Sequence, residues 1–215
     1  MFATLQTEII DRIFRVRQFF LEACDPLKSP NSAAGSKGLV FVLLYAIYEY
    51  TLNQSVTAAM NALCGHKLGL QDVRLELLSV VLDPEICSAG TAGNEHKWDA
   101  RCSLFGRLSS ADPIKIPAKH FPNDGSHYRQ RQLDTIWKLF GIAAPVLADV
   151  KHGSIIEELV EHRNAIAHGR ETPGRIGGRY SAQDVEHRIK QTEAICLHVT
   201  ATLQTHCASA ANLRR

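Results

Sequence analysis

The sequence predicts an all-α protein, an antiparallel helical bundle that forms one domain over residues 1–215 with a mostly helical insertion at about residues 69–125. Apolar residues recur every three or four positions in both terminal segments, which is the period of an amphipathic helix. Residues 114–116 could be extended, but they have no obvious strand partner. Helices without strands favour a bundle in which neighbouring helices bury their apolar faces against one another.

The first predicted helix spans residues 2–23 and has a basic outer face. Its inward face follows a 4-4-3-4 spacing and consists of Leu5, Ile9, Ile13, Val16 and Phe20. A loop rich in proline, serine, asparagine and glycine is expected at residues 25–38. The next helix, residues 37–64, begins apolar on nearly every side, so we expect it at the centre of the bundle.

The insertion is predicted to hold two short helices. The first covers residues 69–84 and is expected to end at Asp83 and Pro84, with a turn at residues 88–94. The second covers residues 97–108. A segment of this length is too long for a plain connection in a compact bundle, so we interpret it as an insertion between the second and third core helices.

Two further core helices are predicted, one before and one after a helix at about residues 155–168. Asp124 or Ser126 is expected to cap the earlier one, which runs to about Phe140. Its inward residues are Leu133, Ile136, Trp137 and Phe140. The last helix begins at Ser181 and runs to about His206. Its seam has a 4-3-4-3-4 spacing and consists of Val185, Ile189, Thr192, Cys196, Val199 and Leu203.

Composition favours a soluble cytoplasmic protein that needs no cofactor and no metal. The six cysteines form neither a C-x-x-C pair nor a zinc-ligand spacing, which is typical of reduced thiols. The N-terminal segment does not resemble a signal peptide, and the longest apolar run, residues 39–48, is too short to span a membrane. Neither a phosphate-binding glycine loop nor a nucleophile elbow is present. Because the net charge is only +2, any affinity for RNA must come from a local basic patch.

One late helix carries the residues with the clearest chemical meaning. Ser154 and Glu157 predict a capping box that places its start near Ile155, and Gly169 predicts its end. Arg163 falls in the middle of the apolar face of this helix. A charge held there must be paired or hydrogen-bonded. Arg163 either forms a structural ion pair with an acidic residue of another helix, or the N–H donors of its guanidinium face a phosphate.

The stretch Arg163-Asn164-Ala165-Ile166-Ala167-His168-Gly169 resembles the R-x4-H signature of the HEPN superfamily, the higher eukaryotes and prokaryotes nucleotide-binding proteins. The resemblance implies a core of four to five helices and an activity of the metal-independent ribonuclease branch. It implies Arg163 and His168 as the catalytic pair. Asn164 is expected to support them, either by a hydrogen bond to the phosphate or by holding His168. It also favours Glu49 as a carboxylate that holds Arg163 or orients His168, although a place for Glu49 at the solvent edge stays open.

The geometry of an ideal helix puts Arg163 and His168 about 140° apart, so the two side chains point in different directions. Either the helix unwinds at His168, or two copies of the helix meet across a two-fold axis. The resemblance implies the second arrangement, a homodimer whose composite site cleaves RNA through its 2′-hydroxyl and leaves a 2′,3′-cyclic phosphate.

The resemblance also implies a biological setting. Proteins of this kind often act as toxins in toxin–antitoxin or phage-defence systems, so an antitoxin or a nucleotidyltransferase is an expected partner beside the RNA substrate. Such a transferase modifies a tyrosine two residues after the histidine, where this chain has Arg170. The nearest tyrosine, Tyr180, lies past the linker, which argues against that variant.

Basic side chains near this stretch are candidates for the rim of an RNA cleft, although each taken singly is better explained as a solvated charge on a loop. They are Arg170, Arg175, Arg179, Lys115, Lys119, His120, Arg129 and Arg131. His162 is expected at the surface, away from the functional pair. Two other interpretations stay open: a non-catalytic HEPN module that binds a nucleotide or a protein, and a structural bundle in which Arg163 is an ion-pair bracket.

Overall fold

The computed structural model describes residues 1–24, 30–115 and 128–208, and over these residues the all-α prediction is confirmed. Nine helices and no strand occur in them, apart from an isolated antiparallel bridge between Gly69 and Pro113. The elements in chain order are α1 (Phe2–Ala23), α2 (Pro30–Gly65), α3 (Leu75–Val81), α4 (Asp83–Thr91), α5 (Lys97–Leu108), α6 (Gln130–Phe140), α7 (His152–Ala167), α8 (Pro173–Gly177) and α9 (Ala182–Cys207).

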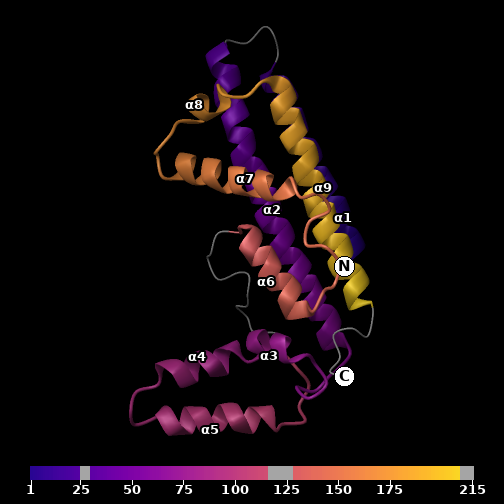
Figure 1. The fold of residues 1–215 in the computed structure, drawn as a ribbon, viewed down its shortest axis with the longest axis vertical. Coiled ribbons are helices and arrows are strands. Elements are labelled where there is room, and N and C mark those ends of the chain that lie inside the picture. Colours follow the sequence, from indigo (N-terminus) through magenta and orange to yellow (C-terminus); the bar gives the residue numbers. More distant parts are fainter. Residues whose placement is uncertain (25–29, 116–127, 209–215) are drawn as a thin grey trace.

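Three long helices, α1, α2 and α9, run alongside one another and form the body of the bundle (Figure 1). The five inward residues predicted for α1 are all buried, and so are the six seam residues predicted for α9. The central position predicted for α2 is also confirmed, because α2 packs against α1, α7, α8 and α9. α9 begins one residue after its predicted start, and Ser181 is its N-cap, whose hydroxyl accepts a hydrogen bond from the Asp184 amide (3.1 Å).

The predicted loop at residues 25–38 is wrong from residue 30 onward, because α2 begins at Pro30. A proline is compatible with the first turn of a helix, where its missing amide proton has no partner in any case. The glycine-rich part that follows is helical because α8 packs directly on it. A Cβ atom added to Gly38 would lie 2.0 Å from the carbonyl oxygen of Pro173. Packing against a distant segment here overrides the weak local helix propensity.

The predicted insertion contains α3, α4 and α5, at one end of the bundle (Figure 1). The helix predicted at residues 97–108 is confirmed by α5. Asp83 and Pro84 begin α4 instead of ending the previous helix, and the predicted turn at residues 88–94 is helical as far as Thr91. The reason is again that an acidic residue and a proline suit the first turn of a helix. Neither α4 nor α5 has a buried residue.

The helix α6 begins at Gln130, and its four predicted inward residues are buried. The Arg129 amide donates to the Gln132 side-chain oxygen (3.0 Å) at its start. The predicted caps Asp124 and Ser126 lie outside the described residues. Among the helices that the structure describes, none is long and apolar enough to cross a membrane.

Candidate functional site

The stretch from Arg163 to Gly169, on which the functional prediction rests, forms the C-terminal end of α7. The Gly169 amide donates to the Ile166 carbonyl (3.0 Å) and the Arg170 amide to the Ala165 carbonyl (2.8 Å), with Gly169 in the left-handed region at φ 66°. This pair of bonds is the Schellman motif. The predicted end of the helix is therefore confirmed, and His168 is its C-cap residue.

The predicted start of this helix is wrong. α7 begins at His152, and the Ser154 hydroxyl donates to the Lys151 carbonyl (2.8 Å) inside the first turn, so Ser154 is not a cap. The N-cap residue is Lys151, which makes no capping bond with its side chain, and its amide donates to the Asp149 carboxylate just upstream of the helix (2.8 Å). Burial of His152 and Gly153 favours this longer helix, since both residues then contribute to the packed face.

Arg163 is half-buried and is held by two contacts. One guanidinium nitrogen donates to the Asn164 side-chain oxygen (3.0 Å). The guanidinium carbon lies 5.2 Å from the ring centroid of Tyr45 on α2, within the range of a cation–π contact. No carboxylate forms an ion pair with Arg163 among the residues described. The alternative of an ion-pair bracket therefore has no acidic partner in the part of the chain that the structure describes.

Glu49 lies one turn after Tyr45 on α2 and is half-buried. In the described part of the chain, no hydrogen bond or ion pair joins it to Arg163 or His168. Burial raises the pKa of Tyr45, and the charge of Glu49, one helical turn away, adds to that rise. Within one chain the residue of α2 that supports Arg163 is thus Tyr45.

Asn164 is 7% exposed, and its described hydrogen bond goes to Arg163 instead of His168. His168 is exposed at the helix terminus. The structure therefore brings Arg163 and Asn164 together, whereas Glu49 and His168 are each without a described bond to that pair.

A second polar cluster, which sequence reasoning missed, joins α7 to Tyr180 and to α9. His162 Nε2 lies 2.7 Å from the Tyr180 hydroxyl, which donates to Glu158 (2.6 Å). Arg188 donates to the same carboxylate (2.7 and 3.3 Å). A hydroxyl has one proton, so we assign the proton of this imidazole to Nε2. The predicted surface position of His162 is wrong, because its ring also packs edge-on against Phe41, at 4.9 Å between centroids.

This cluster makes the stability of the fold depend on pH. Burial lowers the pKa of His162, and the charge of Glu158 only partly offsets that effect. The folded protein then binds fewer protons than the unfolded chain once the pH falls below about 6.5. The stability that the neutral His162 imidazole provides is fully present above about pH 6.5. It is lost as the pH falls toward the pKa of His162 in the folded protein. We expect the free energy of unfolding to drop between pH 7 and pH 5, and to drop less in His162→Gln.

Urea denaturation at both pH values measures the difference. His187→Gln, at an exposed position, is the matched control and should behave like the wild type. An equal drop in His162→Gln and the wild type would contradict the conclusion that His162 causes the loss of stability.

Glu158 affects the stability of the fold at a lower pH than His162. Burial raises its pKa, but the hydrogen bonds from Arg188 and Tyr180 outweigh this and hold the pKa below its usual value.

Several basic residues predicted for an RNA rim are engaged with acids. Arg129 forms ion pairs with Glu157 and Glu161 on α7. Arg175 and Arg179 both pair with Glu171. The remaining predicted rim residues in the described chain are exposed and have no ion pair there; they are Lys115, Arg131 and Arg170. Lys119 and His120 lie outside the described residues.

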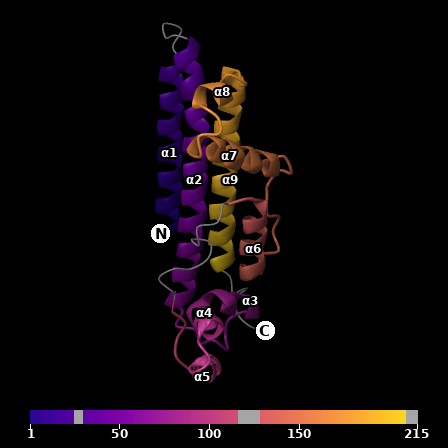
Figure 2. The ribbon, with the colours of Figure 1, turned by 90° about the vertical axis from the view of Figure 1, so that its left-hand side faces the viewer.

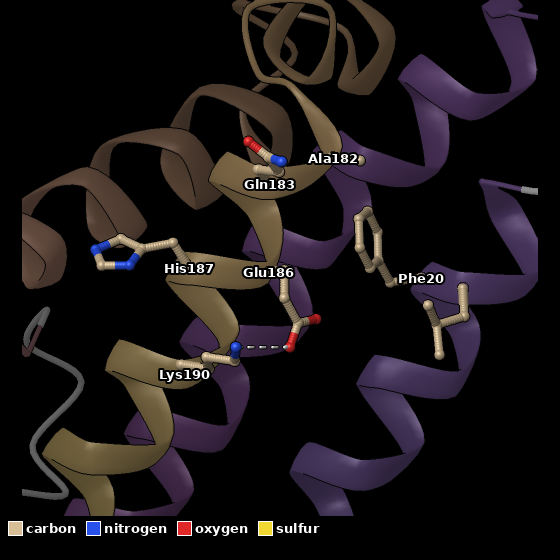
Figure 3. Close-up of a pocket in the computed structure, with 7 residues that line it drawn as sticks. Phe20, Ala182, Gln183, Glu186, His187 and Lys190 are labelled. Atoms are coloured by element: carbon tan, nitrogen blue, oxygen red, sulfur yellow. Dashed lines mark ion pairs between the residues drawn. The ribbon is translucent and has the colours of Figure 1, made fainter.

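A groove between the end of α1 and the start of α9 is lined by Phe20, Leu21, Ala182, Gln183, Glu186, His187 and Lys190 (Figure 3). It contains none of the predicted site residues, and Lys190 forms an ion pair (4.0 Å) with Glu186, one turn away on the same helix. Among the described residues, no group of three histidine, cysteine or acidic side chains is arranged to hold a metal ion. The candidate site is therefore the end of α7, not this groove.

Comparison with known proteins identifies one matching family. A family model described as HEPN_MAE_28990-like HEPN matches residues 1–206, a range that includes the segment predicted as an insertion. No curated protein and no solved structure matches the chain. The match covers most of the chain and includes both the bundle and the Arg163–His168 stretch. The chain therefore belongs to the HEPN family that this model describes.

Proposed function

We propose that the protein is a metal-independent endoribonuclease whose site combines Arg163 of one chain with His168 of a second. Membership of the HEPN family supports a module of the nuclease or RNA-binding type. The observation that carries the finer proposal is the half-buried Arg163, held by Asn164 and Tyr45 and not neutralised by a described carboxylate. Such a guanidinium is ready to bind a phosphate.

The proposed reaction uses the nucleophile that RNA itself carries. A base takes the proton of the 2′-hydroxyl, whose oxygen then bonds to the adjacent phosphorus. The bond from phosphorus to the 5′-oxygen breaks, and an acid supplies the proton to that leaving oxygen. Imidazole titrates near neutral pH and suits both proton transfers, which we assign to His168. Arg163 stabilises the negative charge on the phosphorane, and Asn164 holds Arg163 in position.

The biological setting remains a proposal of the same kind. We infer a toxin of a toxin–antitoxin or phage-defence system, restrained by an antitoxin. Expression in a bacterial host should then arrest growth, and His168→Ala should relieve the arrest.

Cleavage of a labelled single-stranded RNA in EDTA tests the chemistry directly. We expect His168→Ala to slow cleavage by about 10²–10⁴-fold, the usual contribution of a general acid or base. Thermal melts of both proteins confirm that the variant is folded, which an exposed residue should allow. The wild-type product should carry a 2′,3′-cyclic phosphate.

Two other results would argue against this function. Equal background cleavage by the wild type and the variant, on several RNAs, would favour the non-catalytic HEPN module that binds a nucleotide or a protein. Activity that survives in His168→Ala would exclude this histidine from the reaction.

A further inference from the structure

We propose that α5 binds single-stranded RNA through an outward face formed by Trp98, Arg101 and Phe105. Trp98 is 68% exposed and Phe105 66%. At about 100° per residue, the two aromatic side chains lie about 20° apart around the helix and two turns apart along it. We call these three residues the α5 face. The inference rests on the proposed function, because it assigns the strand that binds here to the RNA substrate.

Packing of the fold does not account for these two aromatic side chains. α5 has no buried residue, and its side chains that pack against the core are the partly buried Leu104 and Leu108. Trp98 and Phe105 lie about 90° around the helix from those leucines. Large apolar side chains that are exposed together are typical of a surface that binds a ligand or a partner.

The charges beside the rings favour a nucleic acid as that partner. Arg101 lies three residues after Trp98 and four before Phe105, and its guanidinium carbon lies 5.0 Å from the Trp98 ring centroid. Lys97 lies one turn before Arg101 on the same flank. Neither of these two basic residues has an ion pair among the described residues. A cation beside an exposed aromatic ring suits a nucleotide, whose base stacks on the ring and whose phosphate pairs with the cation.

The same arrangement argues against a membrane as the partner. In a helix that lies on a membrane surface, the basic residues occupy the face opposite the apolar one. Arg101 instead lies between Trp98 and Phe105, and Asp99 lies on the other flank of the pair. An apolar protein groove would have to bury the Arg101 charge, which is costly without an acidic partner. The α5 face therefore suits a strand in which bases and phosphates alternate.

The distance between the two rings allows each to hold its own base. Seven residues of helix span about 10.5 Å along the axis, so one base cannot stack on both rings. Trp98 and Phe105 then stack on two different bases of one strand, with Arg101 near the phosphates that join them. Because every base has a π-face, stacking of this kind tolerates any sequence. We therefore expect the α5 face to add affinity for RNA and little sequence preference.

The α5 face and the candidate catalytic residues belong to elements on the same side of the molecule. The α4–α5 pair and the end of α7 that carries His168 both project to the left of the three long helices in Figure 1, and Figure 2 views the molecule from that side. α6 lies between them in both views and carries the exposed basic residues Arg131 and Lys138. A strand bound on α5 can therefore continue along this side toward Arg163.

Tryptophan fluorescence tests the contact directly, because the chain has only two tryptophans. Trp98 is exposed, whereas Trp137 is 3% exposed and donates its indole N–H to the Ala144 carbonyl (3.0 Å). The probe is a 2′-O-methylated oligouridine of about 15 nucleotides, whose blocked 2′-oxygen prevents the proposed cleavage. It should quench the emission of the full wild-type chain in a saturable way. It should leave unchanged the emission of Trp98→Phe, which comes from Trp137 alone.

The anisotropy of the same oligonucleotide, carrying a dye, measures the affinity. Trp98→Ala and Phe105→Ala should each weaken binding by about fivefold to a hundredfold, the usual effect of removing one stacked ring. Phe14→Ala on α1, where the side chain is 53% exposed, is the matched control and should bind like the wild type. Arg101→Gln should lower the slope of log Kd against log salt concentration by about 0.7, the value for one phosphate contact of a single strand. Circular dichroism and thermal melts check that each variant is folded.

Unmodified RNA separates the α5 face from the proposed chemistry. Trp98→Ala should raise KM and leave kcat unchanged, because the lost contact holds substrate and transition state equally. Absence of quenching, equal binding by Trp98→Ala and the wild type, or equal weakening in Phe14→Ala would each overturn the α5 face. A shift of the Trp98 emission on vesicles of phosphatidylcholine and phosphatidylserine, with no quenching by the oligonucleotide, would overturn it in favour of a membrane. Quenching by the modified oligonucleotide without cleavage of unmodified RNA would overturn the proposed function and leave the α5 face standing.

Discussion

Mixing two inactive variants, Arg163→Ala and His168→Ala, should restore RNA cleavage. If each site takes Arg163 from one chain and His168 from the other, the mixed dimer has one site with both residues and one site with neither. Random exchange makes half of the dimers mixed, so activity should recover to about a quarter of the wild-type value. Each variant alone should be reduced by at least about a hundredfold, because it lacks the phosphorane-stabilising charge or the proton-transfer group at both sites.

The double variant Arg163→Ala/His168→Ala is the matched control. Mixed with an equal amount of wild type, it should break both sites of every mixed dimer and leave about a quarter of the wild-type activity, where independent chains would leave about half. Subunit exchange must be complete before either assay, which a tagged copy can report. Failure of the two single variants to complement, in a confirmed mixed dimer, would show that Arg163 and His168 do not act across the two chains as proposed.

Replacing either of two glycines should unfold the protein most readily. A Cβ atom on Gly38 would lie 2.0 Å from the Pro173 carbonyl oxygen, and one on Gly177 would lie 2.0 Å from the Ala34 carbonyl oxygen. Both atoms belong to the backbone and cannot rotate away, so α8 must move off α2. We expect Gly38→Ala and Gly177→Ala each to lower the free energy of unfolding by about 2–3 kcal/mol. The melting temperature should fall by about 5–10 °C.

Gly35→Ala is the control for helix propensity. It lies on the same helix, and a Cβ there would meet nothing within 4 Å. Replacing a helical glycine by alanine without a clash should leave the melting temperature unchanged or raise it slightly. If Gly38→Ala matched Gly35→Ala in urea and thermal unfolding, the close contact between α2 and α8 would not contribute to stability.

The spacing of apolar residues and the positions of turn residues were enough to predict the features that depend on local sequence alone. The period of α1 and α9 identifies every predicted inward residue of both helices, since a buried stripe requires that spacing. Gly169 identifies the end of α7 because a left-handed residue at that position suits glycine. The same reasoning locates Arg163 near the core without showing what it contacts.

Contacts between distant segments could not be predicted in this way. Tyr45, not Glu49, lies beside Arg163, and a difference of one helical turn on α2 decides between them. The bond between His162 and Tyr180 spans a linker whose path no local rule fixes. The helical start of α2 likewise depends on α8, far along the chain. Packing between distant segments determines each of these contacts. The apolar periodicity shows which face of a helix is buried, but not which helix lies against that face.

The absence of buried side chains in α4 and α5 divides the molecule into regions of unequal stability. Little apolar surface is exposed when these two helices open, so their amide hydrogens will exchange with solvent through a local fluctuation that leaves α1, α2 and α9 folded. Global unfolding will control exchange in the three long helices, whose buried faces form the body of the bundle. The end of α7 packs on the slowly exchanging part, which keeps Arg163 in place while the distal helices open and close.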